Sequence, residues 1–150
     1  MSDDRFQLVG KTLKDEFRVE RFVAEGGFGV VYKATQLTVG RDVALKVLKT
    51  PEDLSPEARA EYLQRFAEEA RTLGKLAHPA IVQVLDFGTA PLGEEGDTAW
   101  MALEWIPGDT LEDELKARRK QGGRAPAEVM ALLRDVLRAM AHAHDLGFAH

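Results

Sequence analysis

Apolar and polar residues alternate in several short segments of the first half of the chain, a pattern typical of half-buried β-strands. The alternation covers residues 17–23, resumes at 30–34 and appears again at 42–48. A cluster of glycines separates the first two segments, and Val39-Gly40-Arg41 indicates a turn before the third. The pattern therefore predicts three antiparallel strands in succession, with glycines at the bend of the first hairpin.

Helical spacing follows the third strand. Ser55-Pro56-Glu57 has the features of a helix start, with a capping serine, a proline at the first helical position and an acid in the first turn. Apolar residues then recur at helical intervals to about Leu76, and His78-Pro79 ends the segment. Two more apolar segments, 81–87 and 99–105, indicate a fourth and a fifth strand.

The last third of the chain is predicted to be helical. We expect a short charged helix over 111–120 and a longer one over 126–146, ended by Gly147. The longer segment has too wide an apolar surface for a helix that buries one side, so we expect self-association or partner docking through it. The order of elements predicts an α+β fold, in which a five-stranded antiparallel sheet carries one main helix and two helices of an incomplete helical region follow.

Composition and charge exclude several classes of protein. A hydrophobic share of 45% and a charged share of 30% over 150 residues are ordinary for a folded, water-soluble domain or part of one. The formal net charge of −5 argues against nucleic acid as the main ligand, because binding to phosphate backbones needs clustered cations. The absence of cysteine excludes disulfides and thiolate ligands. No signal core or membrane-spanning run is found, so we expect a cytoplasmic protein without membrane contact in this segment.

The glycine cluster lies in Ala24-Glu25-Gly26-Gly27-Phe28-Gly29-Val30-Val31. Glycines let backbone amides approach phosphate oxygens and allow positive φ at a bend. Taken alone, the cluster favours a structural hairpin turn. A dinucleotide-binding fold is disfavoured because the glycines lead into a strand and not a helix. The third strand supports a nucleotide site, because alternation places Ala44 and Lys46 on one face, where they suit an adenine edge and a phosphate.

Six motifs follow one another along the chain: Ala24-x-Gly26-x-x-Gly29-x-Val31, Val43-Ala44-Leu45-Lys46, Glu69, His78-Pro79-Ala80-Ile81-Val82, Leu103-Glu104-Trp105-Ile106 and Leu146-Gly147-Phe148-Ala149-His150. Together they resemble the protein kinase family, and bacterial serine/threonine kinases in particular. The resemblance implies a lead-in over 1–16, a kinase N-lobe and hinge over 17–106, and the start of a helical C-lobe over 107–150. Ala24 departs from the family's usual glycine, from which we expect reduced loop flexibility more than lost binding.

The resemblance implies an ATP site. Lys46 would hold the α- and β-phosphates and pair with Glu69, which periodicity places at the border of the buried helix face. The alternatives are a solvated strand lysine and a surface carboxylate that pairs with Arg65. Leu103 would be the gatekeeper, and backbone groups of the hinge would bind the adenine. The expected nucleotide contacts are Val23, Ala24, Gly26, Gly27, Phe28, Gly29, Val31, Ala44, Lys46, Leu103, Glu104 and Ile106.

Other residues have a structural alternative beside the functional one. Leu73, Val84 and His150 would belong to the family's internal hydrophobic spine, although ordinary core packing explains the apolar ones equally well. Asp86-Phe87-Gly88 spells the family's metal-binding triplet, but it precedes the hinge, so we expect it to be structural. His142 and His144 lie on different sides of a helix and are not expected to bind a metal.

The resemblance also implies what this sequence lacks. The catalytic aspartate and the metal ligands of the family follow the histidine of the catalytic loop, and the sequence ends at that residue, His150. We therefore expect Mg²⁺ only in the complete kinase, and we expect this chain to be inactive toward a protein substrate. The alternative is a non-catalytic, kinase-like module for nucleotide binding or protein interaction, which docks on a partner through its last helix.

Overall fold

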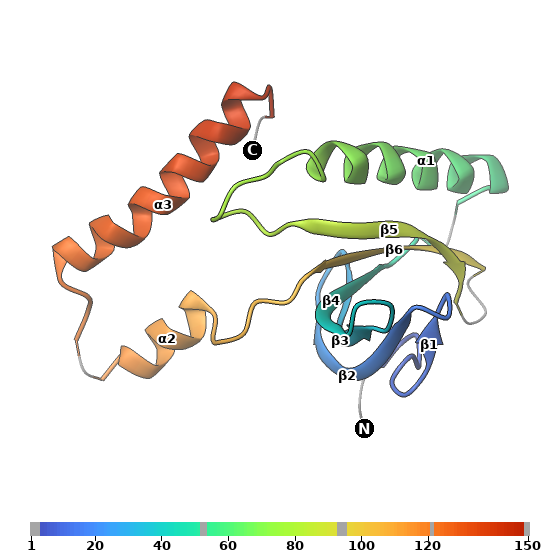
Figure 1. Ribbon diagram of the computed structural model, residues 1–150, viewed down its shortest axis with the longest axis horizontal. Helices are drawn as coiled ribbons and strands as arrows, with labels where there is room; N and C mark the ends of the chain where they lie inside the picture. Colours follow the sequence, from blue (N-terminus) through green and yellow to red (C-terminus); the bar gives the residue numbers. More distant parts are fainter. Residues whose placement is uncertain (1–3, 52–53, 93–95, 121, 149–150) are drawn as a thin grey trace. The chain divides into compact units, whose positions relative to one another are not determined.

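A computed structural model describes residues 4–51, 54–92, 96–120 and 122–148 (Figure 1). The chain divides into two compact units, of which the first comprises the residues up to Lys75 together with Gln83–Trp105. Its elements are β1 (Thr12–Leu13), β2 (Phe17–Glu25), β3 (Gly29–Gln36), β4 (Arg41–Leu48), α1 (Pro56–Leu73), β5 (Val84–Pro91) and β6 (Asp97–Glu104). The second unit comprises Leu76–Val82 and the residues from Ile106 onward, with α2 (Leu111–Arg118) and α3 (Pro126–Asp145).

The sheet confirms the α+β class but has one more strand than expected. Its six strands lie in the order β1-β2-β3-β4-β6-β5, and every neighbouring pair is antiparallel. The prediction of five strands was wrong because β1 has two residues, too few to show alternation. The predicted start of the fourth strand at Ile81 was also wrong, since the Ile81 N–H donates to the His78 carbonyl in a turn and β5 begins at Val84.

One face of the sheet is buried across its central strands β3, β4 and β6. Directly opposite residues of antiparallel strands place their side chains on the same face. Tyr32, Leu45 and Ala102 form such a row across three strands, and none of them is exposed to solvent. The core cluster around this row also includes Phe17 and Trp100, whose ring centroids lie 5.3 Å apart.

The segment before β2 belongs to this core. Phe6, Leu8 and Leu13 are buried in the same cluster as the sheet residues. We had expected only a lead-in here, because three apolar residues scattered among polar ones show neither strand nor helix periodicity. The segment therefore contributes to the packing of the unit that carries the glycine hairpin.

Asp4 anchors this segment through its carboxylate. The Tyr32 hydroxyl donates to Oδ1 at 2.5 Å, and the Val9 N–H donates to Oδ2 at 3.1 Å. Burial raises the pKa of Asp4, but the hydrogen bonds from Tyr32 and from nearby amides outweigh it and hold the pKa below its usual value. Burial and the bond to Asp4 raise the pKa of the Tyr32 hydroxyl.

We expect Asp4→Ala to lower the free energy of unfolding by about 1–3 kcal/mol at pH 7, because the buried Tyr32 hydroxyl loses its acceptor. A carboxyl whose pKa is lowered by folding stabilises the native state above its unfolded pKa of about 4, and this contribution disappears as the pH falls through the folded pKa. Urea unfolding of both proteins at pH 7 and pH 3 should show a smaller difference at pH 3. An equal difference at both pH values would contradict this role of Asp4.

Helix α1 begins as the sequence predicts. The Ser55 side chain accepts from the Ala58 N–H at 3.2 Å, and Pro56 occupies the first helical position. The helix packs on β5 and β6, with Ala70 as its one buried residue. It therefore lies at the β5 side of the sheet, within the first unit.

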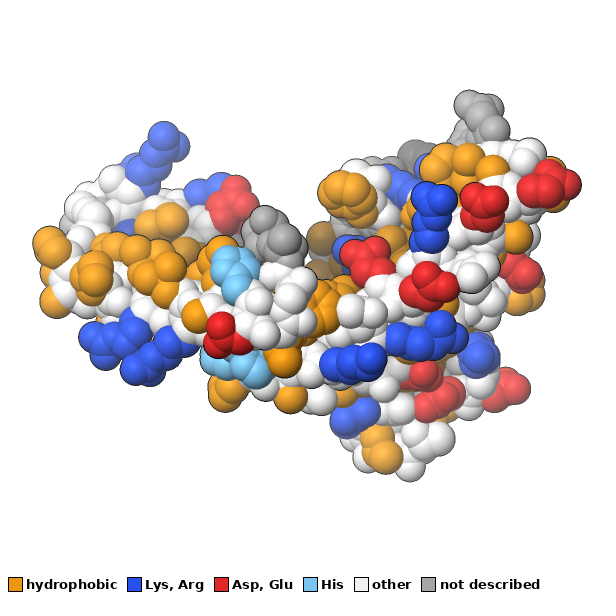
Figure 2. All heavy atoms as spheres, turned by 90° about the horizontal axis from the view of Figure 1, so that it is seen from above, with side chains coloured by type: hydrophobic (Ala, Val, Ile, Leu, Met, Phe, Trp, Pro, Cys, Tyr) orange, Lys and Arg blue, Asp and Glu red, His pale blue; other side chains and the backbone are white. Residues whose placement is uncertain are grey.

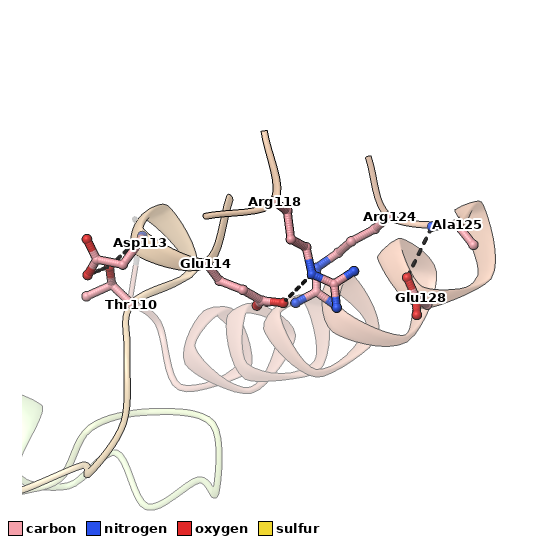
Figure 3. A network of polar contacts seen from close by, with 7 residues as sticks. All are labelled: Thr110, Asp113, Glu114, Arg118, Arg124, Ala125 and Glu128. Atoms are coloured by element: carbon pink, nitrogen blue, oxygen red, sulfur yellow. Dashed lines mark hydrogen bonds and ion pairs between the residues drawn. The ribbon is translucent and has the colours of Figure 1, made fainter. Parts of the chain in front are cut away.

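Polar contacts cap both helices of the second unit and tie α2 to the segment before α3 (Figure 3). Thr110 caps α2 by accepting from the Asp113 N–H at 3.1 Å, and Glu114 of α2 pairs with both Arg118 and Arg124. The carboxylate of Glu128 accepts from the Ala125 N–H at the start of α3. The predicted bounds of both helices agree with the structure to within two residues.

Helix α3 has the wide apolar surface that its sequence predicts. Figure 2 shows hydrophobic side chains gathered along this helix. Those that remain exposed in the structure are Val129, Met130, Leu132, Leu133, Val136 and Leu137. Self-association or partner docking through this surface stays a prediction.

Candidate functional site

The glycine segment forms the turn between β2 and β3, as expected. The Gly26 N–H donates to the Gly29 carbonyl at 2.9 Å and closes the turn, and Phe28 beside it is 82% exposed. Within the described part of the chain, the N–H groups of Gly27 and Phe28 donate no hydrogen bond. The turn therefore offers two adjacent backbone donors to a ligand, as anion-binding turns do.

The three glycines of the turn have different roles. A Cβ atom at Gly29 would lie 2.4 Å from the Val47 carbonyl oxygen, whereas a Cβ at Gly26 or Gly27 would meet nothing within 4 Å. None of the three has positive φ, so the turn does not use the left-handed conformation that glycine allows. Gly29 is required by the close approach of β4, and only Gly26 and Gly27 leave open space around the turn.

The strand register brings four of the expected nucleotide contacts together. Val31 lies opposite Lys46, and Ala44 lies opposite Leu103. Since opposite residues share a face and alternate residues of one strand do too, Val31, Ala44, Lys46 and Leu103 form one patch. All four are half-buried, on the face of the sheet opposite to the Leu45 row. Ala24 lies opposite Val31 in β2 and extends this patch toward the turn.

Val23, another expected nucleotide contact on β2, does not join this patch through the strand register. It lies at an irregularity in the pairing of β2 with β3, between Phe22 and Ala24, and has no partner in the register. Its side chain is exposed. Its expected contact with a nucleotide stays a prediction.

Lys46 and Glu69 are not paired in this structure. No ion pair within 4.0 Å joins them among the described residues, Lys46 is half-buried, and Glu69 is exposed. Glu69 lies on α1 between the half-buried Phe66 and Leu73, at the border of the face that buries Ala70, and its side chain is exposed, so its pairing with Lys46 stays a prediction. Arg65 does not supply the alternative, since it pairs with Glu61 at 3.7 Å.

The expected hinge residues lie at the end of β6. The Glu104 N–H donates to the Gln83 carbonyl at 3.0 Å, and its carboxylate accepts from the Gln83 N–H at 2.9 Å. Of the two backbone groups of Glu104, the N–H is therefore occupied, and only the carbonyl remains as a candidate to bind adenine. Ile106 belongs to the second unit and is exposed.

Two further residues of the first unit were given no role from the sequence. The Trp105 ring lies 5.5 Å from the Arg21 guanidinium and 5.9 Å from the Lys33 ammonium, so two strands contact the residue after β6. Lys49 follows β4 and contacts the glycine turn. No local pattern in the sequence distinguished it from other strand-end lysines.

The metal-like triplet is part of a strand. Asp86-Phe87-Gly88 lies within β5, and the Asp86 carboxylate accepts from the Phe87 N–H at 2.8 Å. A Cβ at Gly88 would lie 3.1 Å from the Trp100 ring, so this glycine serves packing. No group of histidine, aspartate or glutamate side chains that could hold a metal is present among the described residues.

The expected spine residues have ordinary positions. Leu73 and Val84 are half-buried, at the end of α1 and the start of β5. His150 lies outside the described residues.

Comparison with known proteins adds relatives of one type. The chain is 37% identical over 142 residues to the serine/threonine-protein kinase PknA of Mycobacterium tuberculosis, which covers 95% of this chain and 31% of the relative. It is 32% identical over 143 residues to the serine/threonine-protein kinase PrkC of Bacillus subtilis, covering 95% of this chain and 20% of the relative. The chain thus spans less than a third of the length of these relatives. None of its described helices is long and apolar enough to cross a bilayer.

Solved structures agree with these relatives. The crystal structure of the Mycobacterium tuberculosis PknI kinase domain matches with a TM-score of 0.71 and 26% identity, over 94% of this chain and 53% of that one. The apo form of PpkA-294 matches with a TM-score of 0.72 and 28% identity, over 94% of this chain and 52% of that one. The protein kinase domain family matches residues 17–150. The chain therefore belongs to the protein kinase family and is of the bacterial serine/threonine type.

Proposed function

We propose that this chain is the ATP-binding portion of a serine/threonine protein kinase. The observation that carries the proposal is the patch formed by Val31, Ala44, Lys46 and Leu103, which the strand register assembles beside the glycine turn. It combines a small apolar surface, a cation without an ion-pair partner among the described residues, and two free backbone donors. An adenine, an α,β-phosphate pair and a γ-phosphate need these three features.

Each part of the patch has a task in this proposal. The apolar side chains of Val31 and Ala44 hold the adenine ring, and Leu103 limits how deeply it enters. The Glu104 carbonyl accepts a hydrogen bond from the adenine amino group, while Ile106 belongs to the second unit and is proposed to contact adenine only by family resemblance. Lys46 and the N–H groups of the glycine turn bind the phosphates.

The pairing of Lys46 with Glu69 requires a rearrangement. The two side chains are not paired here, and Glu69 faces solvent. We propose that the pair forms only when α1 moves so that the Glu69 carboxylate approaches Lys46 on β4. A kinase needs this pair in place for efficient transfer, so the described arrangement binds nucleotide without promoting chemistry.

The described residues contain no cluster of three or more histidine, aspartate or glutamate side chains for a metal, and the Asp86 carboxylate accepts a hydrogen bond within its own strand. We derive no step through a metal, and we propose that the isolated chain binds ATP without transferring phosphate to a protein. Transfer of labelled phosphate from ATP to a generic protein substrate, above the level of a buffer blank, would contradict this part of the proposal alone.

Lys46→Met is expected to weaken ATP binding by about ten- to a hundredfold, because a charge-assisted contact contributes roughly 1.5–3 kcal/mol. The ATP-induced rise in melting temperature should therefore be largely lost. Lys116→Met is the matched control, since Lys116 pairs with Glu112 on the exposed surface of α2 in the second unit. An unchanged ATP-induced rise in the Lys46 variant would show that the site is assigned to the wrong residues.

One observation favours a second function. The apolar surface of α3 remains exposed in the structure, as a non-catalytic interaction module would need. Sedimentation of the purified chain, together with its melting temperature in the presence of ATP, decides between the two functions. The interaction module is favoured if the chain forms a stable complex that Leu137→Lys dissociates and if ATP does not raise the melting temperature.

A further inference from the structure

Lys49 contacts the glycine turn at three places. Its Nζ donates to the Gly26 carbonyl at 3.0 Å and forms an ion pair with Glu25 Oε1 at 2.5 Å. Its backbone N–H donates to the Phe28 carbonyl at 3.2 Å. A single residue after the end of β4 therefore holds both sides of the turn between β2 and β3.

These contacts engage the electronegative groups of the turn and leave its N–H donors unengaged. Lys49 engages the carbonyl oxygens of Gly26 and Phe28 and the carboxylate of Glu25, which are the groups that repel an anion. The N–H groups of Gly27 and Phe28, which attract an anion, donate to nothing in the described chain. A backbone anion site requires this arrangement, with donors available and acceptors turned elsewhere.

The ion pair is partly shielded from water. The side chains of Lys49 and Glu25 are 24% and 28% exposed, in contrast to the Lys116–Glu112 pair on α2, where both exceed 60%. Exposed ion pairs contribute little because solvent screens them and long side chains lose freedom. The shielding and the two additional hydrogen bonds make Lys49 a stronger constraint on the turn than a surface pair.

We infer that Lys49 is a positioning residue that holds the glycine turn with its backbone donors available to the polyphosphate of ATP. The inference rests on the proposed function and adds a second lysine with a different task. Lys46 contacts phosphate directly, whereas Lys49 acts through the turn. Its contribution therefore depends on the presence of phosphates on the ligand and is absent for adenosine.

The test compares adenosine with ATP in calorimetric titrations of the full chain. Lys49→Met should weaken ATP binding about tenfold, since it removes two charge-assisted contacts, and should leave adenosine binding within about twofold. Lys49→Arg keeps the donors and should restore most of the ATP affinity. Lys116→Met is the control, because Lys116 pairs with Glu112 on α2, outside the sheet and the glycine turn, and should change neither affinity.

The outcomes separate the inference from the proposed function. If the wild-type chain binds ATP and Lys49→Met binds it equally well, or loses adenosine to the same extent, the inference fails and the proposed function stands. If the wild-type chain binds neither ligand, the proposed function fails and the phosphate role of Lys49 fails with it. Hydrogen exchange without nucleotide then tests the contact itself, since the Gly26 amide should exchange faster in Lys49→Met, and unchanged exchange would refute it.

Discussion

Gly29→Ala is expected to lower the free energy of unfolding by about 3 kcal/mol, the upper part of the range for overpacked sites. The added Cβ would lie 2.4 Å from the Val47 carbonyl oxygen and 3.2 Å from the Leu48 Cα. Both are backbone atoms of β4, so no side chain can rotate to make room. Either β3 and β4 separate at this end or the turn is displaced, and both changes break hydrogen bonds of the ladder.

Gly27→Ala provides the control within the same turn. A Cβ there meets no atom within 4 Å, and its φ is not in the left-handed region, so we expect a change below about 0.5 kcal/mol. Chemical denaturation of the two variants measures the difference. An equal loss of unfolding free energy in both variants would mean that any side chain in the turn is destabilising, and that the close approach of β4 to Gly29 is not the cause.

The double variant Phe6→Ala/Leu8→Ala is expected to lose about 5 kcal/mol or more, because large-to-small changes in a core cost roughly 2–5 kcal/mol each. The two side chains are 5% and 6% exposed and belong to the main core cluster. A small domain has a total stability of about 5–15 kcal/mol, so the variant should be partly or fully unfolded at 25 °C. Near-ultraviolet circular dichroism and the urea midpoint measure this.

Val9→Ala is the matched control, since Val9 lies in the same segment and is 46% exposed. It should change the stability by less than about 0.5 kcal/mol. The comparison matters because the matched family region begins at residue 17, after this segment. A double variant as stable as Val9→Ala would show that the sheet folds without residues 4–16.

The local part of the candidate site could be predicted from the sequence. Alternation along one strand is enough to place Ala44 and Lys46 on the same face, whatever the strand pairs with. The turn at Gly26–Gly29 and the helix start at Ser55 were likewise predicted from short stretches, because hairpin turns and helix caps are set by neighbouring residues. These features appear in the structure where the sequence places them.

Contacts between distant residues could not be predicted in the same way. Periodicity placed Glu69 at the border of the buried face of α1, but whether its carboxylate reaches Lys46 depends on how α1 packs on β5 and β6. Phe6 is buried because it packs in the core cluster with residues of the sheet that are distant in the sequence. The residues next to Phe6 in the sequence show no periodicity that predicts this burial.

Short-range periodicity and motif order in the sequence were enough to predict β2, β3, β4, β6 and the three helices, the shared face of Ala44 and Lys46 and the resemblance to the kinase family, but not β1 or the start of β5. Only the tertiary structure decided that Gly29 serves the approach of Val47, that Lys49 holds the turn, and that Lys46 and Glu69 are unpaired. The physical reason is that such contacts join residues brought together by strand register and helix packing, whose energies depend on distances of a few ångströms that no local pattern encodes.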